Sequence, residues 1–139
     1  MTFERQGKSP PYGRELIERI DEQARSLNAR DCLIAVDEEG RQHAGAYIVR
    51  SGDTAYYLMG GGNPELRNSG ASSLILWEAI RNQPDSVKYF DFEGSMLEPV
   101  ERFFRAFGAQ QTPYFRVTKT DSRALQLAMQ LRKTFGTSH

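Results

Sequence analysis

The stretch MGGGNPELRNSGASS, residues 59–73, decides how the rest of this chain is interpreted. Three glycines and an Asn-Pro pair follow an apolar run, and small residues then lead into an amphipathic pattern. A glycine-rich break that leads into a helix leaves the first backbone N–H groups of that helix unpaired. Those donors, together with the positive end of the helix dipole, can hold a phosphate or a carboxylate. The stretch therefore predicts the end of a strand, a break in the sheet, and a helix whose N-terminus binds an anion.

The candidate anion-binding residues are six consecutive positions at this junction: Arg67, Asn68, Ser69, Gly70, Ala71 and Ser72. The small side chains among them would let a ligand approach the backbone closely, and the arginine would add a charge-assisted hydrogen bond. A purely structural interpretation is also open. Ser69 or Asn68 is a good helix cap by itself, and a glycine-rich loop alone is a weak signal of ligand binding.

Upstream of the junction, the pattern predicts one helix and three strands. Apolar residues recur at helical spacing from residue 14 to about residue 28. Three short runs follow, each closed by a turn: residues 32–36, 44–49 and 55–59. Three strands joined by tight turns are typical of an antiparallel meander. Cys32 lies in the first run with no histidine nearby in sequence, so we expect it to be a small buried hydrophobe rather than a nucleophile.

Downstream of the junction, helices and strands alternate. We expect a helix over residues 69–82, with Leu74, Leu76, Trp77 and Ile80 on its apolar face. The elements expected after it are a strand at 88–92, a helix from Pro99 closed by Gly108, a strand at 114–118 and a helix at 122–135. The order α-β-β-β-α-β-α-β-α predicts one α/β domain over residues 14–139, preceded by a flexible arm at 1–13.

Composition excludes several classes of protein. The 139 residues are about one domain long, and 18 basic and 18 acidic side chains cancel, which argues against a broad nucleic-acid or membrane surface. One cysteine and two histidines leave little for a metal cluster, so we expect no metal. The chain begins without an apolar signal core, and no apolar run approaches the roughly 20 residues that span a bilayer. We therefore expect a cytoplasmic protein without a membrane partner.

At this point the chain resembles a known family. The spacing Arg67-x-x-Gly70-x-Ser72 after a three-strand meander is similar to the acyl-CoA-binding loop of the GNAT acyltransferases. Residues 72–80, 89–95 and 100–108 resemble the FemAB-like branch more specifically. That branch contains the methicillin-resistance and peptidoglycan-bridge aminoacyltransferases and their acetyltransferase-like relatives, which usually have two GNAT-like halves. The resemblance covers roughly residues 14–120 and matches one half.

The resemblance implies a twisted mixed β-sheet flanked by helices and a transferase that uses acetyl-CoA or another acyl-CoA as cosubstrate. The acceptor would be a small-molecule amine, and an aminoacyl ester would be the alternative donor. In catalytic GNAT enzymes, a tyrosine four residues before a helix-ending glycine often protonates the departing CoA thiolate. The matching position here is Phe104, which has no hydroxyl, and an asparagine usually found seven residues earlier would fall at Leu97.

Two other residues are candidates for proton transfer. Asp91, Glu93 and Ser95 alternate along the strand that begins at residue 88, and strand ends near a helix N-terminus are common ligand sites. Glu93 is therefore the candidate general base for the amine. The alternative is that these carboxylates cap the next helix or pair with its arginines, 102 and 105. Tyr114 is either a displaced general acid or an aromatic residue at the edge of the core.

Two function classes follow. The first is a FemAB-like acyl- or aminoacyltransferase half-domain in which Glu93 is the base and positioning supplies most of the catalysis. The second is a non-catalytic ligand-binding or assembly domain that self-associates as a homo-oligomer or pairs with a partner half-domain. A basic C-terminal helix with Arg123, Arg132 and Lys133 is the only feature that suggests tRNA. Tyr47, Tyr56 and Tyr57 either line a substrate groove or reflect the preference of strands for tyrosine.

Overall fold

The computed structural model describes residues 13–94, 97–113, 117, 119 and 122. The chain divides into two units, Met1–Ala109 and Gln110–His139, and the elements below all belong to the first. Of the predicted elements, the arm at 1–13 and the last strand and helix, at 114–118 and 122–135, lie almost entirely outside the described residues. These elements and the single-domain boundary stay predictions.

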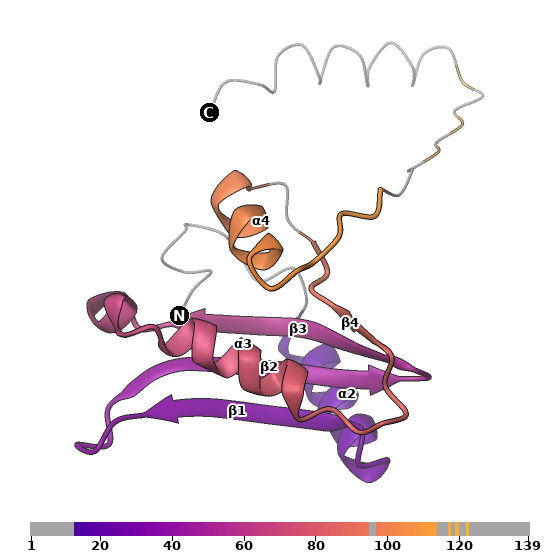
Figure 1. The fold of residues 1–139 in the computed structure, drawn as a ribbon. Coiled ribbons are helices and arrows are strands. Elements are labelled where there is room, and N and C mark those ends of the chain that lie inside the picture. Colours follow the sequence, from indigo (N-terminus) through magenta and orange to yellow (C-terminus); the bar gives the residue numbers. More distant parts are fainter. Residues whose placement is uncertain (1–12, 95–96, 114–116, 118, 120–121, 123–139) are drawn as a thin grey trace. The chain divides into compact units, whose positions relative to one another are not determined.

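A mixed four-stranded sheet forms the centre of the first unit (Figure 1). Helix α2 (Arg14–Ser26) precedes the strands β1 (Arg30–Val36), β2 (Gln42–Ser51) and β3 (Thr54–Gly62). These three strands pair antiparallel in chain order, which confirms the predicted meander. Strand β4 (Tyr89–Asp91) then pairs parallel with β3 at the edge of the sheet.

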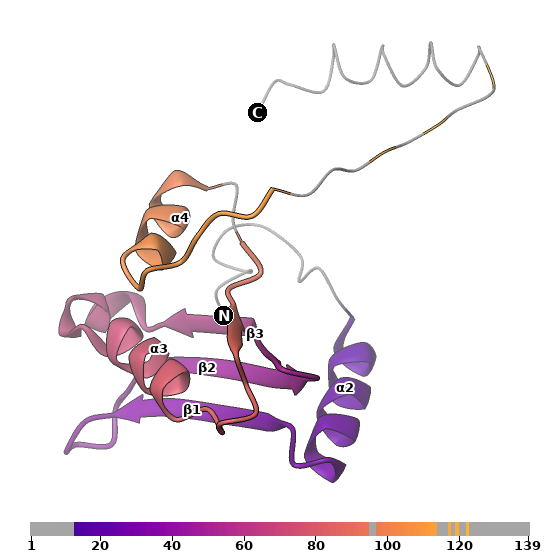
Figure 2. The same cartoon turned by 45° about the vertical axis from the view of Figure 1, so that its right-hand side comes forward.

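Helices lie on both faces of this sheet, as expected (Figure 2). The 3-10 helix η1 (Pro64–Ser69) and helix α3 (Ala71–Arg81) connect β3 to β4, and α4 (Glu98–Arg105) follows β4. Helix α3 packs on β2 through Ile75 and Ala79. Helix α2 contacts the opposite face, where the Tyr47 hydroxyl donates to Asp21 Oδ1 at 2.9 Å. Within the described ranges, no helix has both the length and the apolar character needed to cross a bilayer.

The core lies between α3 and the middle of the sheet, and it is built mostly from small side chains. Its buried residues are Ala44, Ala46 and Ile48 of β2, Ala55 of β3, and Ile75 and Ala79 of α3. The side chain of Ile48 is completely buried. Because alanines occupy the strand positions beneath α3, the helix backbone can approach the sheet closely, and Ile75 and Ile48 supply most of the apolar volume.

The structure corrects the predicted apolar face of α3. Leu74 and Trp77 were expected inside, yet they are 57% and 53% exposed, whereas Ile75 and Ala79 are buried. Only Leu76 of the predicted set is fully buried. Positions four apart share one side of a helix, so placing Ile75 and Ala79 on the alanines of β2 turns Leu74 and Trp77 outward.

The prediction that residues 32–36 form a buried strand holds for one face only. Leu33 and Ala35 pack against the core, whereas Cys32 is exposed and Ile34 and Val36 are 54% and 60% exposed. Successive strand residues point to opposite faces. Helix α2 lies on the face of β1 that carries Arg30, and Arg30 Nε lies 3.0 Å from Asp21 Oδ1 of that helix. The side chains further along the same face, from Cys32 to Val36, are exposed. Cys32 is therefore not the buried hydrophobe that we expected.

The glycines after Met59 do not break the sheet. Strand β3 continues through them, with Gly60, Gly61 and Gly62 paired to Ala46, Gly45 and Ala44. Backbone pairing needs no side chain, so a glycine run can complete a strand when its partner is fixed by packing. The strand ends at Gly62, and the next residue, Asn63, starts η1 because its side chain accepts from the Glu65 N–H at 3.0 Å.

The buried position of Ile48 leads to a stability prediction. Replacing Ile48 by Ala should lower the free energy of unfolding by about 2–5 kcal/mol, because it removes apolar contact and leaves a cavity beneath α3. The matched control is Ile34→Ala on the exposed face of β1, where the loss should stay below about 1 kcal/mol. Urea unfolding monitored by circular dichroism measures both. Equal losses for the two variants would contradict this account of the core.

A polar cluster closes the turn between β1 and β2. His43 Nε2 lies 2.9 Å from Asp37 Oδ2, and the backbone N–H and Nε of Arg41 donate to the same carboxylate at 2.8 and 2.6 Å. These contacts, the one with His43 foremost, hold the pKa of Asp37 well below its usual range. The carboxylate form therefore stabilises the folded state.

This lowered pKa sets the sign of a pH dependence. Stability from Asp37 is present above the ordinary aspartate pKa of about 3.9 and is lost as the pH falls below that value, because the unfolded chain binds the proton first. Urea unfolding between pH 7 and pH 3 should show Asp37→Asn losing less stability over this interval than the wild type. Parallel profiles for the two proteins would show that the carboxylate contributes nothing.

Candidate functional site

The N-terminus of α3 carries no capping side chain. Gly70 occupies the cap position in the left-handed conformation, with φ of +75°, and the first turn of α3 contains no acidic residue. The first intrahelical bond runs from the Leu74 N–H to the Gly70 carbonyl at 3.0 Å, and the Ala71 N–H has only a long contact of 3.4 Å to Ser69 Oγ. The first-turn N–H groups, with the helix dipole, can therefore receive an anion.

The structure places the six predicted anion-site residues on both sides of this cap. Arg67, Asn68 and Ser69 are exposed in the last turn of η1, Gly70 is the cap itself, and Ala71 and Ser72 begin α3. The expectation that Ser69 or Asn68 caps the helix is wrong. Pro64 begins a 3-10 helix that takes in both residues, so α3 begins two positions later than expected, after a glycine that makes the turn.

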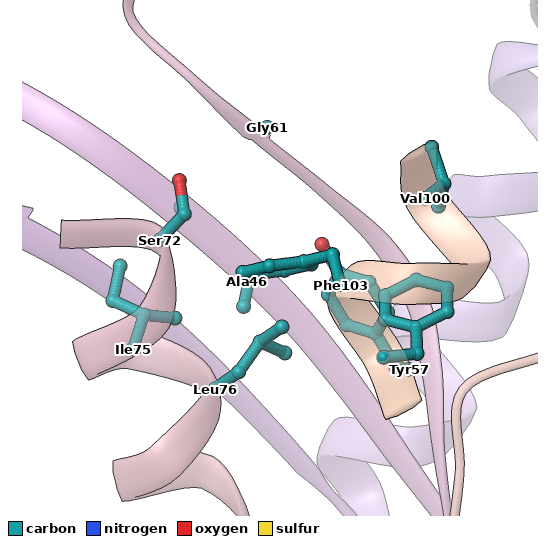
Figure 3. Close-up of a pocket in the computed structure, with 10 residues that line it drawn as sticks. Ala46, Tyr57, Gly61, Ser72, Ile75, Leu76, Val100 and Phe103 are labelled. Atoms are coloured by element: carbon teal, nitrogen blue, oxygen red, sulfur yellow. The ribbon is translucent and has the colours of Figure 1, made fainter. Parts of the chain in front are cut away.

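A pocket of about 190 Å³ adjoins this N-terminus (Figure 3). Helices α3 and α4 face each other across it, with Ser72, Ile75 and Leu76 on one side and Val100 and Phe103 on the other. The remaining lining residues come from β2, β3 and α4: Gly45, Ala46, Tyr57, Gly61 and Phe104. Ser72 belongs both to the first turn of α3 and to the pocket wall, so the candidate anion site and the pocket are continuous.

The pocket exists because two neighbouring strands separate. Strands β3 and β4 pair over only three positions, Thr54 to Tyr56 with Tyr89 to Asp91. Beyond Tyr56, β3 continues to Gly62 with β2 on one side and no paired strand on the other, among the residues that the structure describes. The side chains of α4 lie at this opening.

A β-bulge sets which residues face the pocket. Tyr47 pairs with Met59 and Ile48 pairs with Tyr57, so Leu58 is an extra residue in β3. An extra residue shifts the alternation of the strand by one, which brings Gly60 to the same face as Tyr57. A Cβ atom at Gly60 would lie 1.7 Å from the Tyr57 hydroxyl oxygen, so the tyrosine side chain passes directly over this glycine.

Aromatic side chains form the α4 wall. Phe104 stacks on Phe92, with ring centroids 4.7 Å apart and an interplanar angle of 23°, and meets Tyr57 edge-to-face at 6.0 Å. Phe103 contacts Phe107 at 5.3 Å. Phe104, which occupies the position matching the GNAT acid, is thus a packing residue, while Tyr57 brings the aromatic hydroxyl into the pocket. Burial raises the pKa of Tyr57, so its hydroxyl stays protonated at neutral pH.

The two predicted proton-transfer residues are placed differently. Glu93 lies two residues past β4 with φ of +60°, is exposed, and is not among the residues that line the pocket. Its backbone N–H donates to Asp91 Oδ1 at 2.7 Å, so the strand alternation expected through Ser95 already ends at Asp91. Tyr114 lies outside the described residues. The base and acid roles of Glu93 and Tyr114 stay predictions.

The arginines proposed as partners for these carboxylates have partners on their own helix. Arg102 pairs with Glu98 at 3.5 Å and Arg105 with Glu101 at 2.5 Å, both at a spacing of four residues. Across the described ranges, no group of three or more His, Cys, Asp or Glu side chains is placed to hold a metal ion.

The sequence points to the candidate anion-binding residues but not to the set of residues that lines the pocket. The sequence predicts Gly45 and Ala46 only as strand residues and Gly61 only as part of the break after the strand. It predicts Val100 and Phe103 only as core residues, and all five line the pocket. Tyr57 was noted as a groove candidate beside Tyr47 and Tyr56, and the structure selects Tyr57 alone of the three as a lining residue. The signal that could have found the floor is the run of small residues at 44–46 opposite the glycines at 60–62.

Comparison with known proteins identifies the family. The sequence profile of the acetyltransferase (GNAT) domain matches residues 1–105. The chain therefore belongs to the GNAT acetyltransferase-domain family, whose general chemistry is acyl transfer from an acyl-CoA cosubstrate. A search of curated protein sequences returned no significant match.

Solved structures support the same fold. An aminoglycoside antibiotic 6′-N-acetyltransferase from Acinetobacter baumannii is similar, with a TM-score of 0.56 and 16% sequence identity over 81% of this chain and 84% of that one. A Pyrococcus furiosus protein named as an acetyl transferase matches with a TM-score of 0.55 and 16% identity, over 81% of this chain and 82% of that one. At this identity the likeness concerns the fold: a twisted mixed sheet flanked by helices.

The left-handed cap leads to a prediction about the anion site. Nothing lies within 4 Å of a Cβ built at Gly70, so Gly70→Ala should destabilise the protein by about 1 kcal/mol through backbone strain alone. Gly70→Asn should stay closer to the wild type, because asparagine tolerates the left-handed conformation and caps helices well. Chemical unfolding compares the two. A more stable Ala variant would show that the position does not hold this conformation.

Proposed function

We propose that this domain binds an acyl-CoA, with acetyl-CoA as the simplest case, and transfers the acyl group to an amine. The observation that carries the proposal is the continuity of the uncapped N-terminus of α3 with the pocket between α3, β3 and α4, through Ser72. A CoA thioester has a matching shape: charged phosphates at one end and a slender, largely uncharged arm that carries the acyl group.

The residues present fit this cosubstrate. The first-turn N–H groups of α3 and the guanidinium of Arg67, one turn earlier in η1, would hold the pyrophosphate. The small floor at Ala46 and Gly61 leaves room for a narrow chain, and the apolar wall at Leu76 and Phe103 excludes water from an acyl group. The bound thioester supplies an activated acyl group, and the protein supplies its position.

The chain's own groups would then assist attack by the amine. Backbone N–H groups on the unpaired side of β3, beyond Tyr56, are candidates to polarise the thioester carbonyl. Glu93 is the proposed base for the attacking amine, acting through water because its side chain does not line the pocket. The N-acetyltransferase activity named for the Acinetobacter baumannii neighbour supports an amine acceptor.

The finer parts of the hypothesis rest on sequence motifs. We propose that the chain belongs to the FemAB-like branch, on residues 72–80, 89–95 and 100–108, with an aminoacyl ester as the alternative donor. Four further proposals also rest on the sequence alone. They are self-association, a partner half-domain, tRNA contact through the basic residues after 122, and a cytoplasmic location. Tyr114 is the displaced acid that the sequence alone suggests, and the hydroxyl of Tyr57, which lines the pocket, is the alternative for the same role.

The second candidate function is a non-catalytic acyl-CoA-binding or assembly domain. The specific observation in its favour is Phe104, which places a packing ring where a GNAT enzyme usually has its acid. The two candidates share the ligand and differ in turnover, so release of CoA from acetyl-CoA in the presence of amines separates them.

Ligand binding is the first test. Calorimetry with CoA should detect binding to the full chain, and Arg67→Ala should weaken it about tenfold by removing one charge-assisted hydrogen bond to a phosphate. The matched control is Arg81→Ala at the other end of α3, where Arg81 pairs with Glu78 at 3.3 Å and the affinity should not change.

Two outcomes would count against the proposal. Absence of any heat or melting-temperature change at millimolar CoA would remove the acyl-CoA function altogether. Equal weakening by Arg67→Ala and Arg81→Ala would show that the phosphates bind through diffuse charge rather than at the N-terminus of α3.

A further inference from the structure

The hydroxyl groups of the pocket are few. Of its lining side chains, all of them within the described part of the chain, only those of Tyr57 and Ser72 carry one, and the others are apolar or absent. Ser72 lies in the first turn of α3, at the end where the phosphates would bind. Tyr57 lies on β3, opposite the aromatic wall of α4. Among the lining side chains, the apolar part of the pocket therefore contains one hydroxyl, that of Tyr57.

The Tyr57 side chain is held in place by its surroundings. The bulge at Leu58 puts its ring on the pocket face, Phe104 contacts the ring edge-to-face at 6.0 Å, and the hydroxyl lies over Gly60, where any Cβ atom would collide with it. Glycine at position 60 is thus what makes room for the hydroxyl. A donor fixed by packing loses little conformational freedom when a ligand arrives.

The proton of this hydroxyl is not committed elsewhere among the described residues. Tyr47 donates to Asp21 Oδ1 at 2.9 Å, whereas no described residue accepts a hydrogen bond from the Tyr57 hydroxyl. Burial raises the pKa of Tyr57, which keeps the group protonated and able to donate. The hydroxyl thus belongs to a half-buried side chain that lines the pocket, and it has no acceptor in the part of the chain that the structure describes.

We propose that Tyr57 is the general acid of this domain and delivers its proton to the sulfur of the departing thiol, in place of the hydroxyl that Phe104 lacks. The inference rests on the proposed function, because it assumes that the thioester lies in the pocket. Tyr57 and Phe104 are in ring contact, so the hydroxyl reaches the same pocket from the facing strand rather than from α4.

The step balances without any further reactant. The nitrogen lone pair of the amine forms a bond to the thioester carbonyl carbon, and the carbon–sulfur bond breaks with its electron pair going to sulfur. Sulfur takes the proton from the Tyr57 hydroxyl, which leaves a phenolate. The proton lost by the amine nitrogen passes through water to Glu93, the proposed base, and returns through water to that phenolate. The products are an amide, a free thiol and the neutral tyrosine, with Glu93 again a carboxylate.

The test uses bound CoA itself, so no acceptor has to be known. A hydroxyl that donates to sulfur favours the thiolate and lowers the pKa of the bound thiol, which can be titrated through the ultraviolet absorbance of the thiolate. Tyr57→Phe should raise the pKa of the bound thiol by about one to two units. The variant keeps the ring contact with Phe104, and a thermal melt checks that it is folded.

A second variant tests whether the position of the Tyr57 hydroxyl matters, and not only its presence. Gly60→Ala keeps the Tyr57 hydroxyl but adds a Cβ where that hydroxyl lies, so it should raise the pKa of the bound thiol in the same direction. The matched control is Tyr56→Phe, one residue earlier on the strand and not part of the pocket lining, which should leave the pKa of the bound thiol unchanged.

The outcomes distinguish this inference from the function on which it rests. CoA that binds the wild type with a thiol pKa equal to that in Tyr57→Phe overturns the role of Tyr57 and leaves the acyl-CoA site intact. An equal effect of Tyr56→Phe also overturns it, because the effect would not depend on the pocket. If CoA does not bind the wild type, the proposed function fails and this inference fails with it.

Discussion

The packing of α3 against the small residues of β2 is the contact on which the rest of the structure depends. Ile75 and Ala79 lie on Ala44, Ala46 and Ile48, and this contact holds the helix close to the sheet. With α3 fixed there, its N-terminus meets the glycine end of β3, where Ser72 Oγ would lie 3.1 Å from a Cβ on Gly62. Larger side chains on either strand would separate the helix from the sheet and close the space that the pocket uses. Ala46 takes part in both, because it packs in the core and also lines the pocket, and its neighbours Ala44 and Gly45 belong to the core and the pocket respectively.

A second constraint is the irregularity of β3. The strand pairs with β4 for three residues, passes through a bulge at Leu58 and ends in three glycines. Each feature has a separate effect. The short pairing opens the sheet next to α4, the bulge turns Tyr57 toward the opening, and the glycines leave space beside the tyrosine hydroxyl. The site is thus made by departures from a regular strand rather than by a cluster of charged side chains. Neutral overall charge suits such a site, because the candidate anion contacts are backbone N–H groups at one helix end together with the single side chain of Arg67.

Much of the fold could be predicted because its signals are local. The 3.6-residue and two-residue apolar periods marked α2, α3, α4 and the strands to within a few residues, and turn residues at 37–40 and 51–53 indicated the antiparallel meander. The predictions of burial that proved wrong have a common cause. Leu74 and Trp77 are apolar but exposed, and Cys32 lies on an uncovered strand face, because burial depends on which neighbour covers each face. The glycines at 60–62 were expected to end the strand because glycine has a low strand propensity. That propensity takes no account of β2, whose backbone pairs with these glycines and holds them in the sheet. For the candidate site, Arg67 to Ser72 could be found from spacing, whereas the opening between β3 and β4 could not.

The sequence by itself determined the order of the strands and α-helices from α2 to α4, the glycine-containing junction before α3 and the absence of a hydroxyl at position 104, because each depends on residues close together in the chain. Only the tertiary structure decided that Tyr57 lies beside Phe104, forty-seven positions later, and that Ser72 and Phe103 line one pocket. Those proximities follow from the register of β3 against β2, from the bulge that shifts it by one residue, and from the place where β4 stops pairing. Strand register and the position of a helix on the sheet are set by packing between segments that are distant in the sequence. A pattern along the chain carries no information about that packing.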